Sequence, residues 1–122
     1  MTADRQADAH AAILSAARRG EFDRYASALL APAAVRADLL ALAAFAAELA
    51  RIAPLTRREP AMGEIRLQWW REALSVPATD LSGNPIADAV KAAAGRHAWP
   101  IESLLGIVDA HAHDGLADPF AD

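Results

Sequence analysis

The sequence contains no cysteine, which excludes disulfide bonds and metal sites built on thiolates. Large aromatic residues are also scarce, because three tryptophans, three phenylalanines and one tyrosine make up only 6% of the 122 residues. β-branched residues are few and never alternate with polar residues over the length of a strand, which argues against a β-sheet. There is no glycine-rich phosphate-binding loop and no nucleophile elbow. The sequence therefore offers none of the local motifs of nucleotide-binding folds or serine hydrolases.

An excess of positive charge is missing as well. The 12 basic and 16 acidic residues give a net charge of −4, so we expect no binding to nucleic acid. The first 20 residues lack the unbroken apolar centre of a signal peptide. The longest apolar run, residues 39–47, is far too short to span a bilayer. These features predict a soluble, cytoplasmic protein, with peripheral attachment to a membrane as the alternative.

Alanine dominates what the sequence does contain, and it accounts for much of the 54% hydrophobic content. Alanine is the strongest helix former, so this composition predicts an all-α helical bundle in a single domain, residues 1–122. Proline and glycine mark the expected connections at 55–60 and 76–83 and a turn-like tail at 114–122. The expected helices are 2–19, a short helix bearing Phe22, Tyr25 and Leu29, 32–53 ended by Pro54, 61–75, one capped by Asn84 with Pro85 in its first turn, and one opened by Pro100.

The helix predicted over 61–75 has an unusually wide apolar surface. At 100° per residue its apolar side chains form two neighbouring arcs, with Arg66 projecting between them. So wide a surface predicts burial by neighbours on more than one side. The first arc contains Met62, Ile65, Trp69 and Ala73, and the second contains Leu67, Trp70 and Leu74.

Three segments, 23–32, 39–51 and 59–74, resemble the N-terminal part of the squalene/phytoene synthase family. The likeness continues at 84–97 and 107–110. The resemblance implies an isoprenoid-synthase-like helical fold, in a family whose enzymes join two prenyl diphosphates head to head. It covers most of this chain but less than half of the family's domain, so we expect a truncated domain.

The sequence departs from the family at its metal-binding motif. Catalytic members place carboxylates at i and i+4 of this helix, where they hold Mg²⁺ against a diphosphate. The matching positions here are Ala50 and Pro54, which cannot ligate a cation, and the arginine expected just upstream is Ala47. The family's second aspartate-rich motif would lie beyond Asp122. We therefore predict a pseudoenzyme with no catalytic residue, no metal ligand and no bound cofactor.

A second hypothesis follows from the branch of the family that this chain resembles. The Phe-x-x-Glu-Leu-Ala pattern at 45–50 and the Arg-Leu-Gln-Trp-Trp pattern at 66–70 are similar to mitochondrial complex I assembly factors and their bacterial relatives. That branch keeps the fold without the metal-binding aspartates. The resemblance implies a non-catalytic factor with a protein partner in the assembly of a respiratory membrane complex.

Five residues are candidates for a pocket that binds a prenyl or lipid-like ligand: Tyr25, Glu48, Arg51, Arg66 and Trp69. Each also has a simpler interpretation. Tyr25 and Trp69 can be packed core residues, and Glu48 and Arg51 can be solvated helix residues. Arg66 can extend to solvent along its alkyl stem, or it can be buried against Glu48 or Glu59.

The last predicted helix carries a cluster of potential metal ligands, namely His111, His113, Asp109 and Asp114. Residues at i and i+2 diverge on a helix, so a specific metal site is not expected. Half of a helical bundle would also expose apolar helix faces, which favours self-association.

Overall fold

The computed structural model describes residues 3–20 and 22–116, and within these ranges it leaves the side chains of residues 20, 22, 23, 25 and 113–116 undescribed. The described residues form helices and contain no strand, so the all-α prediction is confirmed. The helices are α1 (Ala3–Gly20), α2 (Phe22–Leu29), α3 (Ala33–Ala50), α4 (Ile52–Arg58), α5 (Pro60–Ser75), α6 (Pro85–His97) and α7 (Ile101–Leu116).

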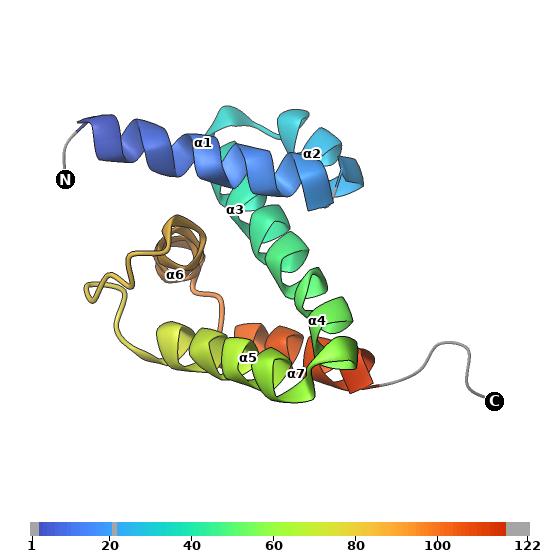
Figure 1. Ribbon diagram of the computed structural model, residues 1–122. Helices are drawn as coiled ribbons and strands as arrows, with labels where there is room; N and C mark the ends of the chain where they lie inside the picture. Colours follow the sequence, from blue (N-terminus) through green and yellow to red (C-terminus); the bar gives the residue numbers. More distant parts are fainter. Residues whose placement is uncertain (1–2, 21, 117–122) are drawn as a thin grey trace.

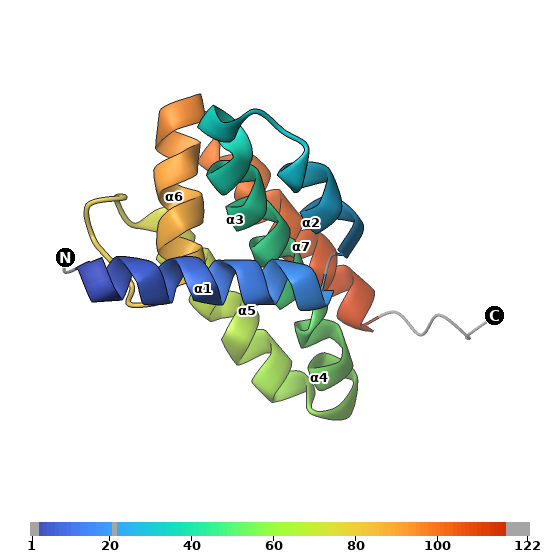
Figure 2. The same cartoon turned by 90° about the horizontal axis from the view of Figure 1, so that it is seen from above.

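The helices lie in three levels (Figure 1). α1 and α2 form the upper level, α5 and α7 form the lower one, and α3 continues into α4 obliquely between them. α6 lies beside α3 in the middle, and α1 crosses over both, as the view from above shows (Figure 2). α3 contacts α1, α2 and α6, whereas α4 and α5 contact each other, and both pack on α7.

The hydrophobic core is built from the inner faces of α3, α5, α6 and α7. The ring of Phe45 from α3 packs against that of Trp70 from α5, with 5.4 Å between ring centroids. Alanines from α3 and α6 fill the remaining space, which lets these two helices approach closely. The largest fully buried side chains are Phe45, Leu49, Leu67, Leu74, Val90 and Val108.

The sequence predicted that Pro54 would end the long helix, but the helical stretch is interrupted at Arg51 and Pro54 lies inside α4. Proline removes the hydrogen bond to the carbonyl of residue 50 and clashes with that carbonyl. α3 therefore ends at Ala50, yet Arg51 keeps helical dihedral angles (φ −73°, ψ −17°) and the chain continues as α4. Pro54 is the third residue of α4, where no intrahelical donor is needed. The predicted polar connection over 55–60 is wrong, because α4 occupies most of it and α5 begins at Pro60.

The start of α6 follows the prediction. The Asn84 side chain accepts hydrogen bonds from the backbone N–H groups of Ile86 at 2.9 Å and Ala87 at 3.2 Å, and Pro85 takes the first position. The preceding loop is held by Lys91, a buried side chain whose Nζ donates to the backbone carbonyl of Asp80 at 2.9 Å.

At the other end of the molecule, α7 extends to Leu116, so the predicted turn-like tail does not begin at Asp114. Residues 117–122 of that tail lie outside the described residues. One helical stretch, Ala33–Arg58, is long and apolar enough to cross a membrane by length and composition alone. The core helix of a globular protein can have the same length and composition, and 56% of the most apolar 18 residues of this stretch are buried inside the protein.

Candidate functional site

A cleft of about 440 Å³ opens along α4 and α5. This size falls within the range of small-molecule sites, which span about 300–1,000 Å³. Charged groups, aromatic rings and aliphatic side chains share its wall. Its lining consists of Glu48, Arg51, Ile52, Leu55, Arg58, Arg66, Trp69, Trp70 and Asn84.

A close approach of α4 and α5 shapes this cleft. Gly63 of α5 lies against the buried Thr56 of α4, and a Cβ atom on Gly63 would be 2.0 Å from the Thr56 Oγ1 and 2.7 Å from its Cα. The Thr56 hydroxyl donates to the carbonyl of Ile52 at 3.0 Å, and this hydrogen bond holds the Thr56 side chain in one orientation against Gly63. The short α4 is thereby held against α5, with Arg58 in its last turn.

Four of the five pocket candidates line this one cleft. Glu48 and Arg51, one helical turn apart, form an ion pair with 3.3 Å between Oε1 and Nη1. Trp69 lies edge-on to Trp70 with 5.1 Å between ring centroids, and 38% of it is exposed. The fifth candidate, Tyr25, belongs to α2, and its side chain lies outside the described residues.

Arg66 is exposed rather than buried against an acidic partner. Glu48 pairs with Arg51 instead, and no side chain in the part of the chain that the structure describes pairs with Arg66. The same holds for Arg58 among the described residues. The cleft thus contains three guanidinium groups and one carboxylate, and two of the guanidinium groups have their donors free for a ligand.

α5 contacts α4, α6 and α7, as its wide apolar surface predicted, but its two apolar arcs have different environments. Leu67, Trp70 and Leu74 are in the core, and Ala73 is buried at the edge of the first arc. The rest of that arc is open: Met62 is 43%, Ile65 is 61% and Trp69 is 38% exposed. Among the described residues, no helix covers this part of α5.

The cleft does not fit a divalent metal ion. Ala50 and Pro54 are exposed, and neither lines it, because at 100° per residue they lie on a different side of the helical stretch from Glu48, Ile52 and Leu55. Glu48 is the single carboxylate in the lining, and it is paired with Arg51. In the described part of the chain there is no group of three or more His, Asp or Glu side chains that could hold a metal ion.

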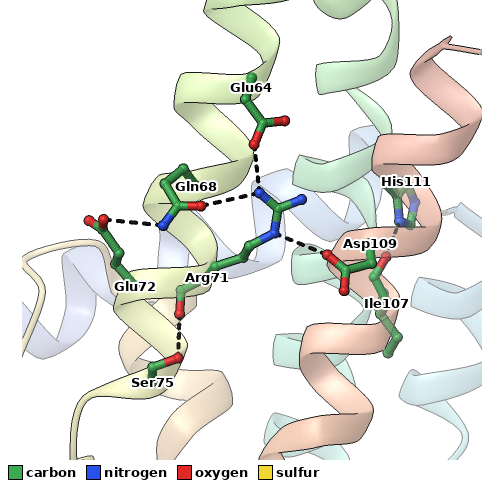
Figure 3. Close-up of polar contacts among 8 residues, drawn as sticks. All are labelled: Glu64, Gln68, Arg71, Glu72, Ser75, Ile107, Asp109 and His111. Atoms are coloured by element: carbon green, nitrogen blue, oxygen red, sulfur yellow. Dashed lines mark hydrogen bonds and ion pairs between the residues drawn. The ribbon is translucent and has the colours of Figure 1, made fainter.

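The polar side of α5 attaches this helix to α7 through Arg71 (Figure 3). Its Nη1 donates to Glu64 at 2.8 Å, and its Nε donates to Asp109 of α7 at 3.0 Å. The hydrogen bond to Glu64, and then the one to Asp109, raise the pKa of Arg71. Asp109 is thus occupied by an arginine, and the Nδ1 of His111 bonds to the carbonyl of Ile107 at 2.9 Å. The side chains of His113 and Asp114 lie outside the described residues.

A second charged cluster, centred on Asp38, joins α3 to the end of α6. Asp38 is only 6% exposed, and it accepts hydrogen bonds from the Arg96 guanidinium, one of them from Nε at 3.2 Å. The Nε2 of His97 lies 2.7 Å from the Asp38 Oδ2, and the His97 ring stacks on Trp99 with 5.1 Å between centroids. The Arg96 hydrogen bonds lower the pKa of Asp38, although burial opposes that shift.

Sequence reasoning missed two of these features. Arg58 was assigned to a polar connection, and only the folding of 52–58 as a helix brings it to the cleft that Arg66 also lines. Asp38 gave a readable signal, because it shares the buried face of α3 with Phe45 and Leu49, where a carboxylate needs a cationic partner. The signal did not identify Arg96, which is 58 residues further along the chain.

Comparison with known proteins gives one family assignment. A family model described as squalene/phytoene synthase matches residues 17–122, which include α2 through α7 and the whole of the cleft. No curated protein and no solved structure matches the chain.

Proposed function

We infer that this chain, which belongs to the squalene/phytoene synthase family, is a non-catalytic member of it. The proposed function is to bind an anionic ligand that has an apolar tail. The class of ligand is a prenyl diphosphate or a similar lipid phosphate, and the binding site is the α4–α5 cleft. The observation that carries this proposal is the pair of free guanidinium groups, Arg58 and Arg66, beside the exposed indole of Trp69.

The charge of the cleft favours an anion. Its three arginines and one glutamate leave an excess of two positive charges, in a chain whose net charge is −4. Guanidinium groups bind phosphate oxygens through paired N–H donors, and such charge-assisted hydrogen bonds are stronger than neutral ones. A diphosphate between Arg58 and Arg66 would engage donors that have no partner among the described side chains.

The apolar wall of the cleft suits the other end of such a ligand. Leu55 of α4 and Trp69 of α5 are the accessible apolar side chains of the lining, whereas Ile52 and Trp70 are each only 5% exposed, so a hydrocarbon tail would pack chiefly on Leu55 and Trp69. A free diphosphate lacks that contribution, so a prenyl diphosphate should bind more tightly than inorganic pyrophosphate.

The same charges oppose metal-assisted chemistry. Mg²⁺ needs hard oxygen ligands, and it completes its shell with phosphate oxygens. Glu48 is held by Arg51, and the neighbouring guanidinium groups repel a divalent cation. Ligand binding in this cleft should therefore be independent of Mg²⁺, and the diphosphate should not be ionised.

Isothermal titration calorimetry with farnesyl diphosphate and with pyrophosphate, each in Mg²⁺ and in EDTA, tests the proposal. We expect equal affinities in both buffers, tighter binding of farnesyl diphosphate, and no release of pyrophosphate. Arg58→Gln and Arg66→Gln should each weaken binding about tenfold, equivalent to about 1.4 kcal/mol. Arg57→Gln is the matched control, because Arg57 is exposed on the same turn but does not line the cleft.

Two results would contradict the proposal: turnover of farnesyl diphosphate in Mg²⁺, or equal losses of affinity in Arg57→Gln and Arg58→Gln. The role as an assembly factor for a respiratory complex stays a separate prediction, because no contact of the described residues bears on it. Deletion of the gene followed by an assay of NADH-linked respiration tests that role, and a normal level of the complex would rule it out.

A further inference from the structure

A second cavity, of about 340 Å³, lies where the end of α5, one face of α6 and the start of α7 meet. Its volume is within the range of small-molecule sites, and it shares no lining residue with the α4–α5 cleft. The lining comes from the last turn of α5 and the chain just after it, from the middle of α6, and from the residues around the start of α7. A single charged side chain, that of Lys91, lines this cavity.

Lys91 is buried to a degree that is rare for a lysine. The residue is only 3% exposed, and burial of an ammonium group is unfavourable unless hydrogen bonds or a negative charge compensate for the lost water. Its Nζ donates one hydrogen bond, to the backbone carbonyl of Asp80 at 2.9 Å. An ammonium group has three N–H donors, so two of them make no hydrogen bond within the described part of the chain.

The acidic side chains of the neighbouring elements do not supply the missing negative charge. None of them forms an ion pair with Lys91, and each is exposed or bound elsewhere: Glu72, Asp80, Asp88 and Glu102. Asp88, on the same helix, accepts hydrogen bonds from the backbone N–H and the hydroxyl of Ser82, both at 2.8 Å. The partial negative charge at the C-terminal end of α5 and the Asp80 carbonyl favour the ammonium, but neither is a full counter-charge.

Apolar surface lies in the same cavity as this ammonium. Val76 is 42% exposed, and Trp99 and Ile101 are each half-buried at the edge of the core. The Trp99 ring stacks on His97 with 5.1 Å between centroids, which fixes the indole in place. A ligand in this cavity can therefore cover apolar side chains with its body while a charged end meets Lys91.

We propose that this cavity, the Lys91 pocket, binds a small monocarboxylate with an apolar body, such as an aryl acid. The carboxylate pairs with the Lys91 Nζ, and the body packs on Val76, Trp99 and Ile101. One ammonium matches one negative charge, whereas the diphosphate proposed for the cleft suits several guanidinium groups. This inference goes beyond the proposed function and does not depend on it, because the two sites have no residue in common.

Titration of the ¹⁵N-labelled full chain with phenylacetate, followed by NMR, tests the proposal. Phenylacetamide has nearly the same shape without the charge, and acetate has the charge without the ring, so these are the matched probes. We expect phenylacetate to shift the Trp99 indole N–H signal along a saturable curve. Phenylacetamide and acetate should each bind at least tenfold more weakly, because each lacks one of the two contacts.

Two variants remove the two parts of the Lys91 pocket separately. Lys91→Met removes the charge and keeps a long apolar side chain, so it should bind phenylacetate at least tenfold less and no better than phenylacetamide. Gly95→Leu keeps the ammonium and fills the cavity from α6, and it should abolish binding. Gly106→Leu is its control, because a Cβ at either glycine meets nothing within 4 Å and Gly106 does not line the pocket. Both leucine variants should keep the far-UV circular dichroism of the parent chain.

Three outcomes would overturn the proposal. The first is equal affinity of the parent chain for phenylacetate and phenylacetamide, and the second is unchanged binding in Gly95→Leu. The third is the lack of saturable binding up to about 10 mM, because Lys91 would then serve only to hold the loop through Asp80. Pyrophosphate titration separates this proposal from that for the cleft: Lys91→Met should keep the parent's affinity for pyrophosphate, and Arg58→Gln should keep its affinity for phenylacetate.

Discussion

Replacement of Gly63 by alanine should destabilise the protein, although alanine normally stabilises a helix. A Cβ at this position would lie 2.0 Å from the Thr56 Oγ1 and 2.7 Å from both its Cβ and its Cα. The contact with Cα is with backbone, so no change of rotamer relieves it and α4 must move away from α5. Overpacking of this kind costs about 3 kcal/mol, at the upper end of the usual range. The better helix propensity of alanine returns about 1 kcal/mol, which leaves a net loss of about 2 kcal/mol.

Thermal unfolding followed by circular dichroism measures this loss, which should lower Tm by about 6–10 °C for a chain of this size. Gly106→Ala is the matched control, because it makes the same change inside α7, where nothing lies within 4 Å of the new Cβ. That control should raise stability by about 0.5–1 kcal/mol. Addition of Thr56→Ala to Gly63→Ala should recover part of the loss, since it removes the 2.0 Å contact and leaves those at 2.7 Å. Equal stabilisation by Gly63→Ala and Gly106→Ala would refute the close packing of α4 on α5.

Three further predictions concern two charged clusters and the positions of the family's metal-binding motif. Asp38→Asn should cost about 1–2 kcal/mol at neutral pH, a figure discounted because the Arg96 side chain is 58% exposed. Arg96 lowers the pKa of Asp38 below its usual 3.8, so as pH falls the unfolded state takes up this proton before the folded state does. The free energy of unfolding in urea should therefore differ most between the parent and Asp38→Asn above that pH, and the difference should shrink below it. A difference that stays constant with pH would contradict the pairing. Arg71→Gln should cost about 1 kcal/mol, because both of its carboxylate partners are largely exposed, and amide exchange in α7 should become faster while that in α1 stays unchanged. Ala50→Asp combined with Pro54→Asp should leave pyrophosphate binding in the cleft independent of Mg²⁺, because these positions do not line it; a gain of Mg²⁺ dependence in calorimetry would show that they do.

Most of the helices could be predicted because their signals are local. Alanine content, apolar spacing and the Asn84 cap act within one or two turns of the chain, and the structure has helices close to the expected bounds. Pro54 shows the limit of such signals. A proline is compatible with the first turn of a helix as well as with the end of one, so the sequence alone did not distinguish a stop from a kink followed by α4.

The environment of α5 could not be predicted because it depends on which helices lie beside it. The two apolar arcs look alike in the sequence, but with α4, α6 and α7 packed on this helix Leu67, Trp70 and Leu74 are buried, whereas Met62, Ile65 and Trp69 stay exposed. The pocket candidates depended on the family resemblance, and helical spacing alone could not bring Glu48 and Trp69 to one cleft. Arg58 joins them only through the tertiary contact between α4 and α5.

The contact of Gly63 with Thr56 links the fold to the proposed function. It places the last turn of α4, and therefore Arg58, across the cleft from Arg66 on α5. A change at Gly63 should disturb both stability and ligand affinity, because it alters the distance between the two helices that carry the guanidinium groups. A change at Arg58 should lower affinity alone, because this side chain is exposed and pairs with no described residue. Loss of affinity without loss of stability in Arg58→Gln is thus the result that separates an anion site from a merely structural cleft.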